Sequence, residues 1–431
     1  MKSKLNNNIA ELLEHNVISQ EVAHRITEYY QTKATSKSKP LFTIFGIFGG
    51  ALVGLGLILI LAHNWDAFSR SIKTLFAFLP LLSGQIISGY AILKKKSSAW
   101  KESSGTFLFF AIGAAIALVS QIYNIPGDLS GFLCIWIVLG LPLIYGLNSK
   151  AVAMLVIGFA TYYACELGYG FNFTDKTPWL YLVMLLATIP FYLKELKRAK
   201  SANTTAIFNM LFPLSLIITL GSFVNSNWSL GFLMYAMLFG VLYNLGKTSF
   251  FKGLQLRQNS FVLLGSLGTV ILFVILSFND IWYEIQRKII HLNSQEGIIV
   301  TVLFLIALAL FIYSKRSSEK SKFNLFQYGF MLFAIVFMIG AEHAALATIL
   351  SNLILLILGV FAVKIGADTF RFSVLNYGLL IISVTIICRF FDTNMSFVLR
   401  GILFVLVGLG FFLSNYIMLK KQKAKHIKTL N

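Results

Sequence analysis

Long apolar stretches separated by short polar connections make up most of the chain. A helix that crosses a membrane needs about 20 apolar residues, and fourteen runs of roughly that length occur. A lipid-exposed backbone must satisfy its own hydrogen bonds, and these runs lack the period-two alternation of a membrane barrel. The pattern therefore predicts an all-α fold, a polytopic transmembrane helix bundle of about 14 spans. The spans are expected at residues 41–61, 74–93, 105–123, 131–147, 151–170, 179–193, 204–224, 230–246, 260–278, 298–314, 325–341, 345–363, 373–388 and 396–419.

Lysine and arginine are unevenly distributed among the connections between these spans. If the N-terminus lies in the cytoplasm and the spans alternate, 29 of the 36 cations fall on the cytoplasmic side and 7 on the outer side. Cytoplasmic loops of membrane proteins carry such an excess. Both termini are therefore expected to be cytoplasmic. The net charge of +19 then belongs to loops that face anionic lipid, and it does not indicate nucleic acid.

The composition supports a protein whose main partner is membrane lipid. Hydrophobic residues make up 57% of the chain and charged residues 12%, against about 25% charged in a typical soluble domain. These values exclude a soluble globular enzyme, a disordered protein and a disulfide scaffold. The three cysteines show no C-x-x-C spacing, which argues against disulfides and against zinc. No metal and no cofactor is expected.

The N-terminal segment is polar and precedes the first apolar run. Leu5, Ile9, Leu12 and Leu13 share one helical face, and Ser19 can cap a second helix. This pattern predicts a small cytoplasmic helical hairpin that packs on the inner face, with docking of a cytoplasmic protein partner as the alternative. The expected domains are the hairpin and linker at 1–40, the transmembrane bundle at 41–419 and a basic cytoplasmic tail at 420–431.

One outer connection, residues 279–297, has the pattern of an amphipathic helix. Ile281, Trp282, Ile285, Ile289 and Leu292 share one face, and the opposite face is polar and charged. A helix of this kind lies in the membrane interface. An interfacial helix is therefore expected here, and a lid over a cavity is the alternative.

Polar and charged residues gather at the span ends that this topology places on the outer side. Two of them, Arg389 and Arg400, run against the charge bias, and each needs an acidic partner. One interpretation is a set of structural ion pairs and loop caps. The other is an outward-facing cavity in which the two arginines receive an anionic group. The candidate residues are His63, Asn64, Trp65, Asp66, Gln121, Tyr123, Asn124, Asp128, Glu166, Glu342, His343, Arg389, Asp392 and Arg400.

Several phrases of the sequence resemble a known family. They are the N-terminal hairpin, the runs Gly56–Asp66 and Gln121–Asp128, and the Arg389 to Arg400 segment. Together they resemble a bacterial family of predicted polytopic membrane proteins, domain of unknown function 2157. The resemblance covers roughly residues 5–145, and the last two spans look similar to full-length members. It implies a bacterial inner (cytoplasmic) membrane and no particular activity.

The sequence contains no Walker A loop, H-E-x-x-H motif or serine nucleophile elbow. Without such a motif to decide, three functions remain in competition. The first is a carrier or binder of an amphipathic anionic, lipid-like molecule, which a wide apolar cavity would favour. The second is a non-catalytic assembly or sensing subunit, which a solid bundle would favour. The third is a membrane enzyme at the outer interface, which converging carboxylates and a histidine would favour. We rank the three in this order, so a role without catalysis is favoured and the enzyme stays open as the third alternative.

Overall fold

The computed structural model describes residues 17–35, 65–169, 176–225, 227–288, 291–316 and 323–392, with single positions and short stretches among 9–15 and 398–420. The chain divides into two compact units, Met1–Phe76 and Ala77–Asn431. The predicted domain boundaries near residues 40 and 420 lie in or beside segments outside the described residues. Those boundaries stay predictions.

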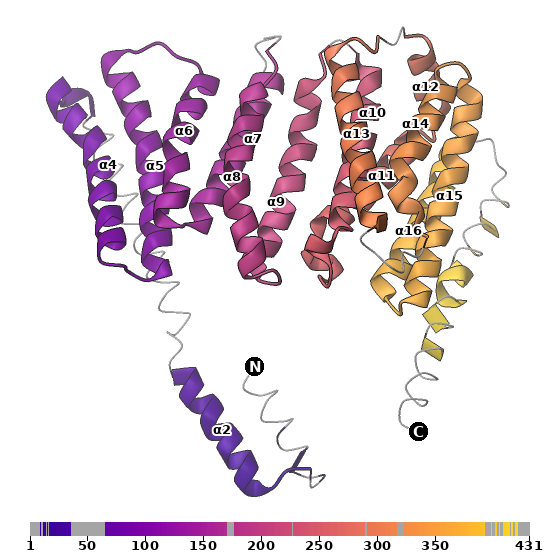
Figure 1. Ribbon diagram of the computed structural model, residues 1–431, viewed down its shortest axis with the longest axis horizontal. Helices are drawn as coiled ribbons and strands as arrows, with labels where there is room; N and C mark the ends of the chain where they lie inside the picture. Colours follow the sequence, from indigo (N-terminus) through magenta and orange to yellow (C-terminus); the bar gives the residue numbers. More distant parts are fainter. Residues whose placement is uncertain are drawn as a thin grey trace. The chain divides into compact units, whose positions relative to one another are not determined.

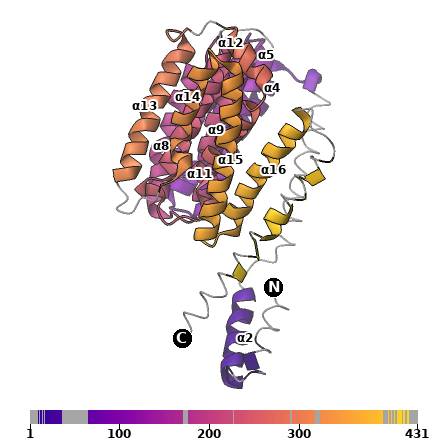
Figure 2. The same ribbon diagram turned by 90° about the vertical axis from the view of Figure 1, so that its right-hand side faces the viewer.

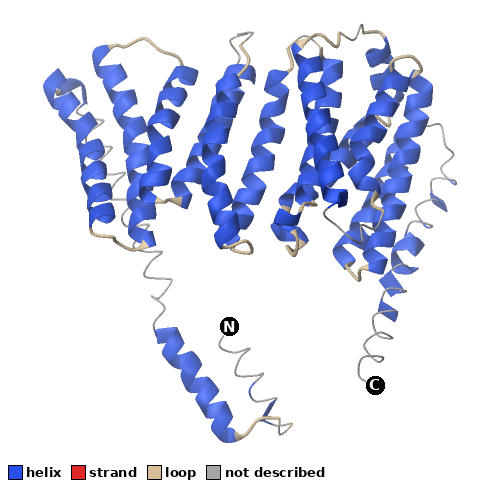
Figure 3. Ribbon diagram, viewed as in Figure 1, coloured by secondary structure: helices blue, strands red, loops and turns tan. Residues whose placement is uncertain are grey.

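All regular structure in the described part of the chain is helical, as Figure 3 shows. The all-α prediction is confirmed. Short 3-10 turns join or extend the longer helices, for example η2 (Gly221–Phe223) after α9 and η5 (Leu325–Tyr328) before α14. The helices of the bundle are α4 (Arg70–Leu93), α5 (Ser98–Tyr123), α6 (Leu129–Leu147), α7 (Lys150–Tyr169), α8 (Trp179–Arg198), α9 (Asn203–Leu220), α10 (Trp228–Gly246), α11 (Ser260–Ile275), α12 (Asn279–Gln286), α13 (Gln295–Arg316), α14 (Gly329–Gly340), α15 (Ala344–Asp368) and α16 (Phe372–Asp392).

Ten of these helices are long and apolar enough to cross a membrane among the residues described. An eleventh span arises if α11 and α12, which meet at an angle of 83°, are taken together. The run expected at 325–341 forms η5 and the shorter helix α14. The runs expected at 41–61 and 396–419 lie outside the described residues or are described only in part. The protein is thus a membrane protein with multiple spans, and the total of about 14 stays a prediction.

Within the larger unit, the helices lie side by side and alternate in direction (Figure 1). Connections 124–128 and 341–343 lie at one end, which we call the Asp128 end. Connections 148–149, 247–259 and 369–371 lie at the opposite end, which we call the Lys247 end. Between residues 77 and 392, the described cations lie at or near the Lys247 end, with four exceptions. The exceptions are Lys176, Arg287, Lys288 and Arg389.

Helix α10 is the most enclosed span, because α11, α13 and α14 all pack against it. In its most apolar 18-residue stretch, 78% of the residues are buried. Glycines allow this close approach: a Cβ on Gly265 of α11 would lie 2.7 Å from the backbone nitrogen of Tyr243. Small residues at helix contacts are the usual device of membrane bundles. Figure 2 shows α13 and α16 at opposite margins of the larger unit, with α14 and α15 between them.

Helix α12 forms only the first part of the amphipathic helix expected over 279–297, since Leu292 lies in the turn before α13. The apolar face of α12 meets protein. Trp282 and Ile285 are fully buried. The Trp282 indole N–H donates to the Leu276 carbonyl at 2.6 Å, and its ring lies against Gly340, where a Cβ would be only 2.3 Å away. Ile289 lies outside the described residues. The described face therefore packs on α14 and α15 rather than on lipid headgroups.

The first unit contains helix α2 (Gln20–Thr35). Its start follows the sequence-based prediction, since the Ser19 hydroxyl accepts a hydrogen bond from the Val22 N–H at 3.4 Å. A side-chain acceptor at this position satisfies one of the free N–H groups of a helix start. Further along, η1 (Trp65–Ala67) precedes α4, and the Lys73 ammonium lies 5.7 Å from the centre of the Trp65 ring.

Candidate functional site

An apolar groove runs between α4, α5 and α6. Its volume is about 940 Å³, within the range of about 300–1,000 Å³ that is typical of small-molecule pockets. Its described lining is almost entirely aliphatic and aromatic. The main lining residues are Phe78, Leu81 and Gln85 of α4, Leu108, Ile112, Ile116 and Ser120 of α5, and Phe132, Ile135, Leu139 and Leu143 of α6.

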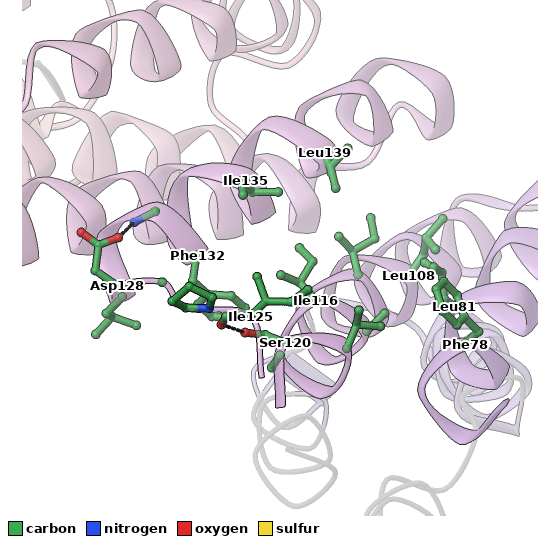
Figure 4. Close-up of a pocket in the computed structure, with 18 of the residues that line it drawn as sticks. Phe78, Leu81, Leu108, Ile116, Ser120, Ile125, Asp128, Phe132, Ile135 and Leu139 are labelled. Carbon is green, nitrogen blue, oxygen red and sulfur yellow. Dashed lines mark hydrogen bonds between the residues drawn. The ribbon is translucent and has the colours of Figure 1, made fainter. Parts of the chain in front are cut away.

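The spacing of these residues explains how each helix presents them. Leu108, Ile112 and Ile116 recur every four residues and so share one face of α5. Ile135, Leu139 and Leu143 do the same on α6. From Leu129 to Leu143 a helix rises about 20 Å, roughly two thirds of the hydrocarbon thickness of a bilayer. Figure 4 shows the lining side chains between Asp128 at one end and Phe78 and Leu81 at the other.

Close packing on the far side of α5 and α6 holds these two helices in place. The Trp136 ring lies flat on Gly113, where a Cβ would be 2.3 Å from the ring. The Trp136 indole N–H donates to the Phe109 carbonyl at 2.7 Å, and the two rings stack with centres 5.3 Å apart. The adjoining faces of both helices line the groove, and Phe132 of that lining lies against the Trp136 ring.

The mouth of the groove is the connection between α5 and α6. Helix α5 ends at Asn124, which takes the left-handed conformation with φ 52°, and the Ser120 hydroxyl donates to the Ile125 carbonyl at 2.8 Å. Helix α6 begins after Asp128, whose carboxylate accepts the Gly131 N–H and the Ser130 hydroxyl, each at 2.9 Å. These bonds, the Gly131 N–H first, hold the pKa of Asp128 below its usual value.

Four of the residues expected in the site lie at this mouth, and a fifth lies on the neighbouring helix. Gln121 and Tyr123 are exposed in the last turn of α5, Asn124 ends that helix, and Asp128 caps α6. Glu166 is half-buried in the last turns of α7. For Asn124 and Asp128, the structure supplies the loop-capping roles that one interpretation of the sequence expected.

A second group lies around the α11–α12 bend and the α14–α15 turn. The Glu342 and His343 side chains are exposed, and the Glu342 carbonyl accepts a hydrogen bond from the Gln286 amide. The Arg389 guanidinium donates to the Ser277 hydroxyl at 3.2 Å and lies 4.8 Å from the centre of the Phe278 ring. The helices that carry this group lie far along the row from the groove (Figure 1).

The structure places the remaining six expected residues in neither the groove mouth nor the group around Arg389. Trp65 and Asp66 form part of η1 in the first unit. His63, Asn64 and Arg400 lie outside the described residues, as does the Asp392 side chain. A single site built from all fourteen residues stays a prediction. In the part of the chain that the structure describes, no three His, Cys, Asp or Glu side chains are arranged to hold a metal ion.

The residues predicted from the sequence do not include Gln85, the buried Glu195 or the half-buried Glu102. Gln85 lines the groove from the middle of α4. A polar side chain inside a span can indicate a cavity, but the prediction rested on charged residues within spans and on polar residues at span ends. Glu195 is 1% exposed and pairs with Lys150 at 2.9 Å. Glu102 accepts the N–H groups of Lys150 and Ala151 and so caps the start of α7. These two acids join neighbouring helices at the Lys247 end.

Comparison with known proteins identifies the N-terminal third of the chain. Residues 10–153 match the model of the family described as predicted membrane protein (DUF2157). The resemblance seen in the sequence is therefore confirmed for this stretch. No curated protein and no solved structure matches the chain. The matched stretch includes α2, α4, α5 and α6, and every described residue of the groove falls within it.

Proposed function

We propose that this membrane protein binds an amphipathic, lipid-like molecule whose apolar chain lies in the groove between α4, α5 and α6. The observation that carries the proposal is the groove itself: about 940 Å³ of largely apolar volume with polar groups at its mouth. An apolar chain gains about 0.8 kcal/mol for each CH₂ it withdraws from water. Within a bilayer this gain is small, so selectivity has to come from shape and from the polar groups.

The polar groups define which head group fits the mouth. Asp128 carries a carboxylate whose charge is stabilised by its capping bonds, and the charge of exposed Lys176 acts on it as well. The sequence predicted an anionic head group. Lys176 would attract such a group, and the Asp128 carboxylate would repel it. A head group that places an ammonium or hydroxyl beside its anion therefore suits this mouth better than a bare anion.

Gln85 adds a requirement within the groove. Its side chain is exposed and lines the cavity at mid-helix, where a lipid tail offers no hydrogen bond. A polar group at this depth is costly without a partner. The ligand that fits best carries a hydrogen-bonding group, such as an ester, partway along its apolar chain.

Photo-crosslinking tests this function. The full chain in nanodiscs would be exposed to phosphatidylethanolamine or phosphatidylglycerol with a photoreactive acyl chain, and labelled peptides would be located by mass spectrometry. Labelling is expected to concentrate on α4, α5 and α6, with the zwitterionic lipid preferred. The variant Ile135→Trp, which fills the groove, should remove most of this labelling. Val138→Trp is the control, because Val138 is exposed on the same helix and does not line the groove.

Two results would contradict the proposal. One is labelling spread evenly over α4–α6 and the exposed face of α13, where Ile298 and Leu305 meet the surroundings. The other is equal loss of labelling in both tryptophan variants. Gln85→Leu separates the role of the polar group, since it should lower labelling while leaving the groove open.

An assembly or sensing subunit is the second candidate, and the first unit supports it. Leu12, Val17 and Val22 are 39%, 65% and 41% exposed, an apolar surface that a cytoplasmic protein partner could cover. The chain is proposed to lie in a bacterial inner membrane with residues 1–40 in the cytoplasm. Deleting residues 1–35 should then abolish co-purification of a partner while leaving lipid labelling of the groove intact. Unchanged co-purification would remove this candidate.

A further inference from the structure

A second cavity, separate from the groove, lies at the Lys247 end. Its volume is about 240 Å³, which corresponds to roughly eight water molecules at about 30 Å³ each. Three parts of the chain form it: the α10–α11 connection, the end of α13 at Ser314 and the α15–α16 turn at Arg371. Residues distant in sequence therefore build one pocket.

Three cations line this pocket, namely Lys247, Lys252 and Arg371. Its described lining includes no aspartate or glutamate. The cations come from a helix end, a connection and a distant turn, so the fold brings them together although each side chain is partly exposed. The Lys247 ammonium lies 5.4 Å from the centre of the Tyr243 ring. The Lys247 side chain is exposed along part of its length, but crowding around its ammonium, and then the charge of Arg371, lower its pKa.

The walls of the pocket are fixed by hydrogen bonds. The Asn259 amide donates to the Gly246 carbonyl at 2.8 Å, which ties the two ends of the α10–α11 connection together. The Lys200 ammonium donates to the Lys252 carbonyl at 2.7 Å. Gly253 turns the connection with φ +87°, a conformation that side chains disfavour. The cations are thus attached to a connection that is braced on both sides.

Polar groups between the cations complete the lining. The Thr248 hydroxyl donates to the Leu245 carbonyl at 2.7 Å, which leaves its oxygen free to accept but not to donate. The Ser249 hydroxyl lies 3.4 Å from the Tyr313 hydroxyl. Such a pocket offers two ammonium groups, one guanidinium and a serine hydroxyl. This set of donors suits a tetrahedral oxyanion.

We infer that the pocket bounded by Lys247, Lys252 and Arg371 binds a phosphate group. Like charges that face one another across a small pocket repel, and a bound dianion converts that repulsion into attraction. The guanidinium can hold two phosphate oxygens at once, and the ammonium groups act as point charges. The phosphate belongs either to a lipid headgroup or to a free phosphate compound, because the chemistry of recognition is the same for both.

The test uses the full chain in maltoside micelles and phosphate-free buffer. In the first arm, inorganic phosphate is titrated by calorimetry, with chloride at equal ionic strength as the reference. In the second arm, phosphatidylglycerol is added and its retention is measured by native mass spectrometry, with diacylglycerol as the lipid that lacks phosphate. Binding in the first arm indicates a free phosphate compound. Selective retention in the second arm indicates a lipid headgroup, and both results support the pocket.

Variants decide whether this pocket is responsible. Arg371→Gln should weaken phosphate or phosphatidylglycerol binding by about tenfold or more, since it removes a charge-assisted contact. Arg257→Gln is the matched control, because Arg257 is an exposed cation of the same connection outside the pocket lining. It should change binding by less than about twofold. Lys252→Gln repeats the test if Arg371→Gln does not fold.

Three outcomes would overturn the inference. The first is no binding in either arm. The second is chloride competing as well as phosphate, which would indicate general charge attraction. The third is an equal loss in Arg257→Gln and in the pocket variants, which would assign the binding to the charged surface as a whole.

Discussion

Helices α4 and α6 are at least as apolar as helix α10, yet far fewer of their residues are buried. In α10, 78% of the most apolar stretch is buried, against 22% in α4 and in α6. Apolar residues bring both regions into the membrane, but they do not decide which helix faces meet protein. Glycines and buried amides do, because α10 meets Gly265 of α11 and carries the buried Asn244. The open region instead leaves apolar faces available for a ligand.

The largest effect should come from a single methyl group at Gly265. Gly265→Ala places a Cβ about 2.7 Å from the Tyr243 backbone nitrogen, and backbone cannot yield as a flexible side chain does. Overpacking of this kind costs about 1–3 kcal/mol. Gly89→Ala in α4 has no atom within 4 Å and should be neutral or stabilise by about 0.5–1 kcal/mol. Thermal unfolding in detergent measures both, and equal effects would erase the contrast between the regions.

A smaller effect is expected from the amides of the two regions. Asn244 is fully buried; its amide donates to the Gln327 carbonyl at 3.2 Å and its oxygen accepts from the Gln327 side chain at 3.3 Å. Asn244→Leu leaves these partners unsatisfied and should cost about 1–2 kcal/mol. Gln85→Leu removes an exposed amide that faces the groove, so the free energy of unfolding should hardly change. If Gln85→Leu destabilises as much, Gln85 holds helices together rather than facing a ligand.

The smallest effect is the pH dependence of the groove mouth. Because the folded protein lowers the pKa of Asp128, the stability it contributes is fully present above the ordinary aspartate pKa of 3.8. That stability is lost as the pH falls through the lowered value. Asp128→Ala should lose both the cap and the acid dependence. Asp128→Asn should keep the cap and lose only the acid dependence.

Unfolding curves between about pH 6 and about pH 3 measure this dependence in the three proteins. Wild type should lose stability relative to Asp128→Asn only at the acid end. A constant difference between the two across the range would assign no role to the ionised carboxylate.

The sequence predicted the helices well because their apolar runs are long. Even the short run at 179–193 forms α8, which continues to Arg198 because Glu195 is buried against Lys150. The end of the run at 260–278 was less predictable. Helix α11 stops at Ile275, and the chain turns through 83° into α12. The sequence indicated a change of direction near residue 279, but not that Trp282 packs on Gly340. Contacts so distant in sequence leave no local pattern.

The candidate site shows the same limit. Asp128, Asn124 and Tyr123 were expected because polar residues at span ends are visible in the sequence. The groove below them was not, since Ile116 and Ile135 look the same whether they meet lipid, protein or a ligand. Only neighbouring helices decide between these cases. Gln85 lies in the groove wall within a predicted span, and its amide could have indicated a cavity.

The burial of Trp282 has a consequence for the order of biogenesis. Helix α12 is synthesised before α14 and α15, so the indole ring has no Gly340 to lie against when it leaves the ribosome. We expect the apolar face of α12 to rest on the bilayer surface until those helices arrive. Arrival of α14 and α15 then transfers Trp282 from lipid to protein. A chain truncated before α14 would therefore leave this tryptophan in contact with lipid, and its fluorescence would report each stage of assembly.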